Sequence, residues 1–246
     1  MSPMRADDAR LPAGCIGVSR ADGLGHHPGM SRPLVPEAIT APGVVAIARR
    51  VSAAAVPTLA DALLAGGIRA LELTLDDPDV ALAAIEAAAR WTAAADGGPA
   101  GGLIVGAGTI RSLDAARRAV DAGATFLVAP HLDPDVVGWA SERGIPALPG
   151  AMTPTEVVAA WSAGAAAIKV FPASTVGPAF LRELRGPLPD IPLQPTGGIT
   201  VENAGDYIRA GAIAVGMGSW LFAGDGPRAV TERAAQAVEA VAEARL

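Results

Sequence analysis

A single lysine, Lys169, is the residue of this sequence best suited to covalent chemistry. The 246 residues contain 19 lysines and arginines, and only one of these is a lysine. An amine can lose its proton, whereas a guanidinium cannot do so in a protein. Lys169 lies between Ile168 and Val170 in an apolar run, where burying an ammonium is costly unless its charge is paired or lost. An uncharged amine there can attack a ketone carbonyl to form a Schiff base. The alternative is a strand-edge lysine that reaches solvent.

Glu72 is the second charged residue inside an apolar run, Leu71-Glu72-Leu73-Thr74-Leu75. Side chains alternate between the two faces of a strand, so this carboxyl can point to the centre of a barrel. Close to Lys169, it could move protons during imine formation and bond cleavage. On these residues alone, a structural ion pair with an arginine such as Arg49 remains the alternative.

Glycines and hydroxyl residues follow other apolar runs. Gly197-Gly198, directly after Thr196, and Gly218-Ser219 are placed where barrel enzymes bind phosphate through backbone N–H groups. The alternative is that these glycines only make turns. Gly106-Ala107-Gly108-Thr109 lacks the third glycine of a dinucleotide-binding fingerprint. Thr109 could bind a substrate carboxylate, or it could simply lie near a helix cap.

Composition excludes several classes of site and partner. Three histidines, at 26, 27 and 131, and one cysteine, Cys15, do not make a metal-binding pattern, so we expect no metal and no cofactor. A net charge of −6 without a basic cluster argues against nucleic-acid binding. No uninterrupted apolar stretch is long enough to cross a membrane.

Short apolar runs alternate with alanine-rich stretches of helical length from about residue 43 onward. This pattern favours buried parallel strands, each followed by a helix. Several helices are expected to begin at Ser112, Asp133, Thr153 or Thr200 and to end at a glycine. The expected strands are 44–48, 70–75, 103–107, 126–129, 146–148, 167–171, 192–196 and 212–215. The expected helices are 52–66, 79–95, 112–122, 134–143, 154–163, 178–185, 201–210 and 228–244.

Eight such units predict an α/β fold, a single-domain (β/α)8 TIM barrel over residues 39–246. The alternative is an open doubly wound sheet. Residues 1–38 have no periodic apolar pattern, and we expect a disordered N-terminal tail there. The residues before Cys15 are too charged for a signal sequence, so a cytoplasmic location is expected.

Taken together, the motifs resemble those of class I aldolases that cleave 2-keto-3-deoxy-6-phosphogluconate or 4-hydroxy-2-oxoglutarate. The similarity covers about residues 40–245, and the lysine motif combined with the Thr-Gly-Gly and Gly-Ser-Trp motifs is specific. The matching segments are Leu71-Glu72-Leu73-Thr74-Leu75, Gly106-Ala107-Gly108-Thr109, Ile168-Lys169-Val170-Phe171-Pro172-Ala173, Pro195-Thr196-Gly197-Gly198-Ile199 and Gly218-Ser219-Trp220.

The resemblance implies a role for each matching residue. Lys169 would form the Schiff base with a small keto acid, and Glu72 would be the general acid and base. Thr109 and Thr196 would contact the pyruvyl carboxylate or the aldol hydroxyl. The phosphate would be held by Gly197, Gly198, Gly218 and Ser219. The resemblance also implies a homotrimer without a metal.

One position departs from the pattern of the family. Members that act on the phosphogluconate often carry arginine directly after the Glu-x-Thr-Leu stretch, where this chain has Asp76. Arg49, at the end of the first expected strand, could supply the missing cation, as in galactonate-type 2-keto-3-deoxy aldolases. Thr196 in Pro-Thr-Gly-Gly instead resembles the gluconate type. Two other functions stay open: a phosphosugar isomerase or phosphate-binding barrel in which Lys169 binds phosphate without a covalent bond, and a non-catalytic barrel that binds a small acid.

Overall fold

The computed structural model describes residues 32–94, 102–224 and 226–246. Within these residues, short strands alternate with longer helices. The strands are β1 (Val44–Arg49), β2 (Ala70–Thr74), β3 (Ile104–Gly108), β4 (Phe126–Val128), β5 (Ala147–Leu148), β6 (Gly150–Ala151), β7 (Ile168–Val170), β8 (Leu193–Pro195) and β9 (Val215–Met217). The helices are α1 (Glu37–Thr40), α2 (Val56–Ala65), α3 (Pro78–Ala94), α4 (Leu113–Asp121), α5 (Pro134–Glu142), α6 (Pro154–Ser162), α7 (Ala173–Arg185), α8 (Val201–Arg209) and α9 (Gly226–Glu243).

The strands form two parallel sheets. One has the order β5-β4-β3-β2-β1-β9 and the other the order β6-β7-β8. β5 and β6 lie on either side of Pro149, and an isolated parallel bridge joins Thr196, after β8, to Gly216 of β9. Consecutive strands are therefore neighbours in space. This is not the order of an open doubly wound sheet, in which the strand order reverses at a switch point, so that alternative was wrong.

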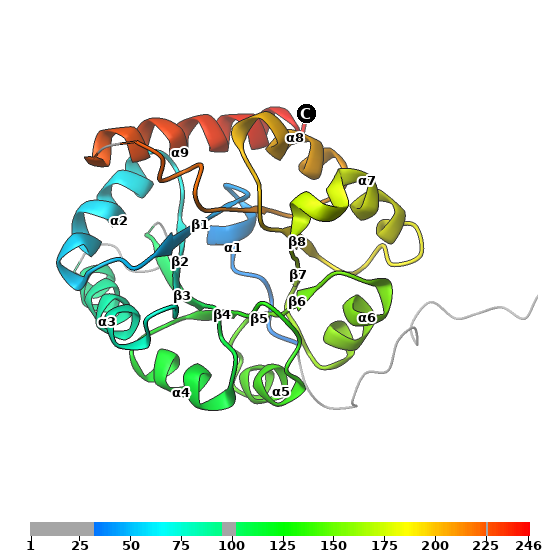
Figure 1. Ribbon diagram of the computed structural model, residues 1–246, viewed down its shortest axis with the longest axis horizontal. Helices are drawn as coiled ribbons and strands as arrows, with labels where there is room; N and C mark the ends of the chain where they lie inside the picture. Colours follow the sequence, from blue (N-terminus) through cyan, green and yellow to red (C-terminus); the bar gives the residue numbers. More distant parts are fainter. Residues whose placement is uncertain (1–31, 95–101, 225) are drawn as a thin grey trace, which may run out of the picture.

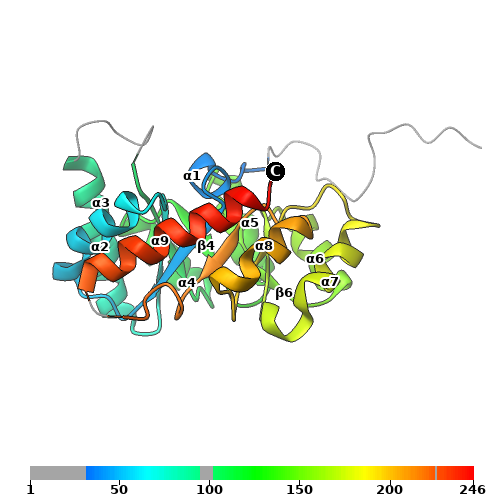
Figure 2. The same cartoon turned by 90° about the horizontal axis from the view of Figure 1, so that it is seen from above.

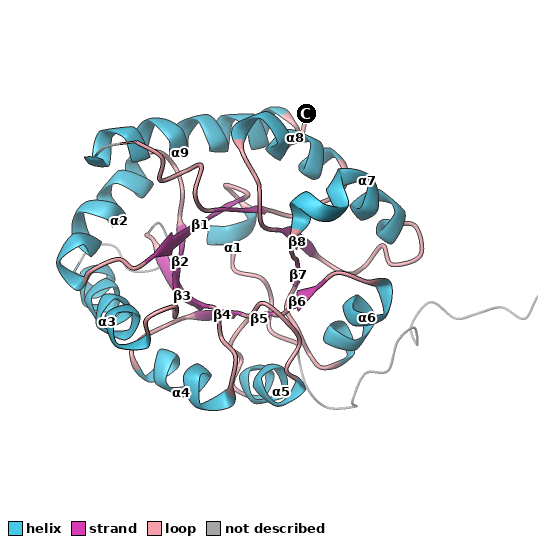
Figure 3. Cartoon of the chain, in the orientation of Figure 1, coloured by secondary structure: helices cyan, strands magenta, loops and turns pink. Residues whose placement is uncertain are grey.

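The strands surround a common centre, and helices α2 to α9 lie outside them (Figure 1). Figure 3 shows the same arrangement, with magenta strands inside cyan helices. Alternate residues of each strand therefore face either the centre or the helices. Outward-facing residues such as Ile168, Val170 and Leu193 belong to the larger buried apolar cluster under the helices. The intervening residues, including Lys169, face the centre.

A smaller apolar cluster fills the centre at the end where the strands begin. It includes Val45 of β1, Ala167 just before β7 and Ile39 of α1, all of them buried. α1 lies on this end of the molecule, away from the level of the strands (Figure 2). The remaining buried members of this apolar cluster are Ala70, Phe126, Val128, Leu148 and Ala214. Because apolar side chains close this end, polar groups of the centre lie toward the carboxyl ends of the strands.

Three of the expected helix starts are confirmed by their capping bonds. The side chain of Ser112 accepts a hydrogen bond from the N–H of Ala115, and that of Asp133 accepts from two backbone N–H groups. Thr153 and Glu156 form a reciprocal capping box before α6. Each bond satisfies a backbone donor that the first turn of a helix would otherwise leave without a partner.

The structure differs from the sequence expectation most clearly at four places. β9 covers Val215–Met217, whereas the expected strand was 212–215. α7 begins at Ala173, five residues early, because a helical turn precedes the break at Gly177, where φ is +71°, and Pro178. β6 was not expected, since Gly150-Ala151 lacks branched residues. α1 begins at Glu37, inside the expected tail 1–38; residues 1–31 of that tail lie outside the described residues.

Candidate active site

A cavity of about 260 Å³ lies at the carboxyl ends of the strands. It is bordered by residues from β1, β2, β7 and β9 and from the loops after β3 and β8. All of the candidate residues named from the sequence line it: Arg49, Glu72, Thr109, Lys169, Thr196, Gly197, Gly198, Gly218 and Ser219. Residues more than a hundred positions apart in the chain therefore meet at one site.

Lys169 reaches the cavity from the middle of β7. Its side chain is only 8% exposed, which rules out a strand-edge lysine in solvent. Its Nζ lies 3.7 Å from Oε1 of Glu72 and 5.2 Å from the centre of the Phe171 ring. The amine is therefore close to one carboxyl group and one aromatic face, and both interact favourably with a positive charge.

Glu72 extends from β2, where it is in register with Ile47 of β1 and Gly106 of β3. Its side chain is 1% exposed, and neither carboxyl oxygen has a hydrogen-bond partner among the described residues. Burial raises the pKa of Glu72, and the positive charges of Lys169 and Arg49 oppose that rise. A carboxyl group with a raised pKa can hold and release a proton nearer to neutral pH.

Glycine at position 108 makes room for the Glu72 carboxyl. A methyl group built on Gly108 of β3 would overlap the Oε1, Cδ and Cγ atoms of Glu72. We expect Gly108→Ala to displace the carboxyl, to lower the free energy of unfolding by about 1–3 kcal/mol and to reduce turnover. Denaturant unfolding and steady-state kinetics measure both effects. Gly138→Ala is the control, because nothing lies within 4 Å of a methyl group at that helical position. Unchanged turnover in Gly108→Ala would contradict the prediction.

Arg49 stands at the rim of the cavity, at the end of β1. Its Nη1 lies 2.9 Å and 3.1 Å from the two carboxylate oxygens of Asp76, and Oγ1 of Thr74 lies 3.1 Å from Oδ2 of the same group. Asp76 thus holds the guanidinium at the rim. The Arg49 side chain is still 60% exposed, so its remaining N–H groups can bind another anion.

The turn after β8 presents backbone groups to the cavity. Gly197 and Gly198 have φ values of +98° and +72°, which residues with a side chain rarely adopt. Asn203 of α8 fixes this turn, since its Nδ2 donates to the carbonyl of Gly198 and its Oδ1 accepts from the N–H of Thr200. The positive end of the α8 dipole therefore lies beside the backbones of half-buried Gly197 and exposed Gly198, an arrangement suited to an anion.

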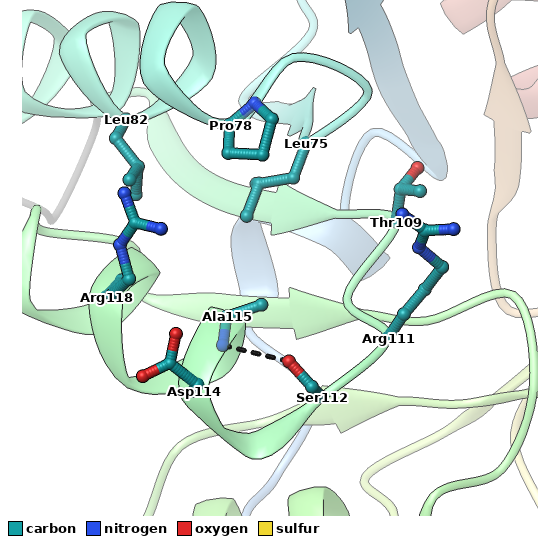
Figure 4. Close-up of a pocket in the computed structure, with 9 residues that line it drawn as sticks. All are labelled: Leu75, Pro78, Leu82, Thr109, Arg111, Ser112, Asp114, Ala115 and Arg118. Carbon is teal, nitrogen blue, oxygen red and sulfur yellow. Dashed lines mark hydrogen bonds between the residues drawn. The ribbon is translucent and has the colours of Figure 1, made fainter.

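Two further cavities adjoin the first. One of about 560 Å³ shares Arg49, Gly218 and Ser219 with it and extends past Arg50 to Leu59. The other, of about 230 Å³, is lined by residues of α3 and α4 and shares Thr109 (Figure 4). Thr109 has a φ of +60°, which is strained for a β-branched residue. Such strain is common at binding sites, where the surrounding structure enforces it.

Gln194 was missed by the sequence analysis. It lies on β8, is fully buried, and neither polar atom of its side chain has a hydrogen-bond partner in the described part of the chain. The signal was a polar residue between Leu193 and Pro195 in a strand run, the same signal that identified Glu72.

The structure also bears on metals and membranes. Within residues 32–94, 102–224 and 226–246, no three His, Cys, Asp or Glu side chains are grouped to hold a metal ion. None of the helices in those ranges combines the length and apolarity needed to cross a membrane.

Comparison with known proteins gives consistent matches. The family model described as KDPG and KHG aldolase matches residues 35–241. A probable 2-dehydro-3-deoxy-6-phosphogalactonate aldolase of Rhizobium meliloti is 34% identical over 196 residues, which are 79% of this chain and 84% of that protein. A solved native KDPGal structure aligns with a TM-score of 0.75 at 30% identity, covering 82% of this chain and 95% of its own. A KDPG aldolase from Legionella pneumophila, solved with pyruvate as a covalent carbinolamine intermediate, aligns with a TM-score of 0.68 at 28% identity, covering 83% and 95%.

Proposed function

Because this chain belongs to the KDPG and KHG aldolase family, we propose that it cleaves a 2-keto-3-deoxy-6-phospho sugar acid by way of a Schiff base on Lys169. The products would be pyruvate and glyceraldehyde 3-phosphate; cleavage of 4-hydroxy-2-oxoglutarate would give glyoxylate instead. Its named relatives are aldolases, so the chain is a carbon–carbon lyase.

One observation carries the covalent mechanism. The sole lysine of the chain is buried, and its amine lies 3.7 Å from a carboxyl group that is buried with it. A lysine that only bound phosphate as a cation would not need a proton carrier beside it. The Legionella enzyme holds pyruvate as a carbinolamine, which is the adduct that this amine would form.

The reaction would proceed in a fixed order. The Lys169 amine attacks C2 of the keto acid, and Glu72 supplies the proton with which the C2 oxygen leaves as water. The protonated imine then withdraws electrons while Glu72 takes the proton of the C4 hydroxyl, and the C3–C4 bond breaks. The resulting enamine is protonated at C3, and water hydrolyses the imine to free pyruvate.

The ends of the substrate would be held by neutral donors and by one cation. The backbones of Gly197 and Gly198 suit the phosphate because they directly precede the α8 N-terminus. The Gly218-Ser219 segment, which borders the same cavity, adds further donors. Thr109 and Thr196 suit the carboxylate or the aldol hydroxyl. Both threonines border the same cavity as Lys169, which supports their assignment to the part of the substrate near the imine.

Substrate choice depends on Arg49. The Rhizobium relative named above is a probable galactonate-type enzyme, and in this chain Arg49 is available at the rim while Asp76 occupies the position where a cation was expected. We propose that Arg49 supplies that charge to the anionic substrate, with Asp76 orienting it. The galactonate-type aldol is therefore the second candidate substrate.

We expect Arg49→Ala to lower kcat/KM for a phosphorylated keto acid by about 10- to 100-fold, since a hydrogen bond to a charged group is worth about 1.5–3 kcal/mol. Asp76→Ala should have a smaller effect, because the guanidinium remains. Steady-state kinetics on phosphorylated and unphosphorylated aldols measure both. Arg90→Ala, at an exposed position of α3, is the control. Equal kcat/KM in wild type and Arg49→Ala would exclude this role.

We also propose that the two sheets form one closed (β/α)8 barrel. β5 and β6 continue one another around Pro149, whose carbonyl accepts a hydrogen bond from the N–H of Lys169. The Thr196–Gly216 bridge and the bond from Ile213 N–H to the Leu193 carbonyl support closure on the opposite side.

Borohydride reduction in the presence of pyruvate tests the covalent mechanism. The expected result is a mass increase that matches one reduced pyruvate adduct, located by proteolysis on the peptide that contains Lys169. A phosphosugar isomerase or a non-catalytic barrel would bind its ligand without such an adduct. Ligand binding with no mass change would therefore overturn the proposed mechanism.

A further inference from the structure

Gln194 occupies a position that an apolar residue could fill. It shares the inward face of β8 with Thr196, which lines the active-site cavity, while Leu193 packs outward under the helices. Its Oε1 and Nε2 atoms are buried without a hydrogen-bond partner in the described residues. Leaving such a group without a hydrogen bond costs about 1–3 kcal/mol. We therefore expect a hydrogen-bonding molecule beside this buried amide.

The neighbours of Gln194 define where that partner must lie. Gln194 is in register with Lys169 of β7, and Lys169 is in register with Gly150 of β6 on its other side. Below them, Ala167 and Ala214 belong to the apolar cluster at the sealed end. Gln194 is therefore a polar group at the floor of the centre, next to the strand that carries the amine.

Other buried polar atoms near Gln194 also lack a hydrogen-bond partner. Both oxygens of Glu72 and Oγ1 of Thr196 also have no hydrogen-bond partner within the described ranges. Glycine positions on the adjoining strands, Gly150 and Gly216, add no side chain to this layer. A buried water molecule requires two to four polar partners. Gln194 is in register with Lys169, whose Nζ lies 3.7 Å from Glu72, and Thr196 follows Gln194 by two residues. Around Lys169, these three side chains therefore offer donors and acceptors for one water.

We propose that Gln194 holds the water molecule that Schiff-base chemistry releases and later consumes. This inference rests on the function proposed above. When the carbinolamine collapses, the C2–O bond breaks, the oxygen leaves as water with a proton from Glu72, and the nitrogen lone pair forms the C=N bond. Gln194 Nε2 donates to the oxygen of that water, and Oε1 accepts one of its hydrogens. In hydrolysis the same water adds back to C2.

Gln194 is thus a positioning residue. An amide does not exchange protons in this pH range, so Glu72 remains the proton carrier, and Gln194 keeps the water between that carboxyl and the imine carbon. Substrate binding does not depend on this contact. Removing the amide should therefore slow imine formation and hydrolysis without weakening the affinity for the keto acid.

The test follows deuterium exchange into the methyl group of pyruvate, which requires the imine and enamine but no cleavage of a carbon–carbon bond. Gln194→Leu and Gln194→Met remove the amide at similar volume, and either one serves if the other does not fold. We expect kcat for exchange to fall about tenfold, the loss of about one hydrogen bond, with KM changed less than threefold. Leu193→Met, on the outward face of the same strand, is the control and should exchange at the wild-type rate.

The outcomes separate this inference from the proposed function. If the wild type exchanges and both Gln194 variants match its kcat within twofold, Gln194 does not hold the water. A raised KM with unchanged kcat would also overturn the inference, since it would make Gln194 a residue that only shapes the binding site. A wild type that neither exchanges deuterium nor forms the borohydride adduct would overturn the proposed function, and this inference with it.

Discussion

Lys169→Met is expected to abolish the reduced pyruvate adduct and to lower turnover by about 10⁴-fold or more, because the variant lacks the nucleophile on which every later step depends. The chain contains no other lysine, so no second side-chain amine can replace it. Intact-protein mass after borohydride treatment and steady-state cleavage kinetics are the measurements. An adduct of undiminished yield in the variant would place the chemistry elsewhere.

Two further variants, Lys169→Met/Glu72→Gln and Lys169→Arg, are controls that distinguish loss of the nucleophile from loss of the fold. Methionine replaces the aliphatic part of lysine without its amine, and the double variant Lys169→Met/Glu72→Gln removes both members of the buried pair, so it leaves no carboxylate without a cation. Circular dichroism and thermal unfolding should show both proteins folded. Lys169→Arg keeps the positive charge but cannot form an imine, so it should be as inactive as Lys169→Met.

Glu72→Gln is expected to lower kcat by about 10²–10⁴-fold, the usual contribution of a general acid and base. The amide keeps the shape of the side chain but cannot carry a proton. Cleavage of the phosphorylated aldol measures the effect, and Glu239→Gln, an exposed glutamate of α9, is the matched control. A kcat within threefold of the wild type would remove Glu72 from the mechanism.

The same variant should be more stable than the wild type at neutral pH. Burial raises the pKa of Glu72 in the folded protein, so the folded state keeps its proton at pH values where the unfolded chain has lost it. The contribution of Glu72 to stability is therefore present below the unfolded pKa of about 4.3 and is lost as the pH rises through the folded pKa. The free energy of unfolding of Glu72→Gln minus that of the wild type should grow between pH 4.5 and pH 7.

Much of the active site could be predicted because its signals were local. Lys169 and Glu72 were charges inside apolar runs, and strand alternation allowed the Glu72 carboxyl to point to the centre. The pair of Arg49 with Asp76 was not predicted, because it joins the ends of two different strands and depends on how their loops turn. Gln194 carried a local signal too, but an uncharged amide does not stand out in a sequence as a charge does.

The fold was predicted to a similar extent. Runs of branched residues located β1, β2 and β7 within one or two residues at each end, since branched side chains suit strands buried on both faces. Gly150-Ala151 was missed because its strand pairing comes from its position between β5 and β7, and its own side chains give no sign of it. α1 was missed because a four-residue segment is too short to show a helical pattern of apolar residues. The helix is held by the burial of Ile39 in the apolar cluster between the strands, which is a tertiary contact.

α1 and the smaller apolar cluster close the centre of the proposed barrel at the end where the strands begin. The active-site cavity is therefore open only toward the carboxyl ends of the strands. Whatever enters must depart through the opening it used. In the proposed reaction, the three-carbon fragment stays tethered to the floor while the aldehyde lies nearer the exit. In that reaction the aldehyde departs first and pyruvate last, an order that the covalent bond to Lys169 and the closed end of the barrel impose together.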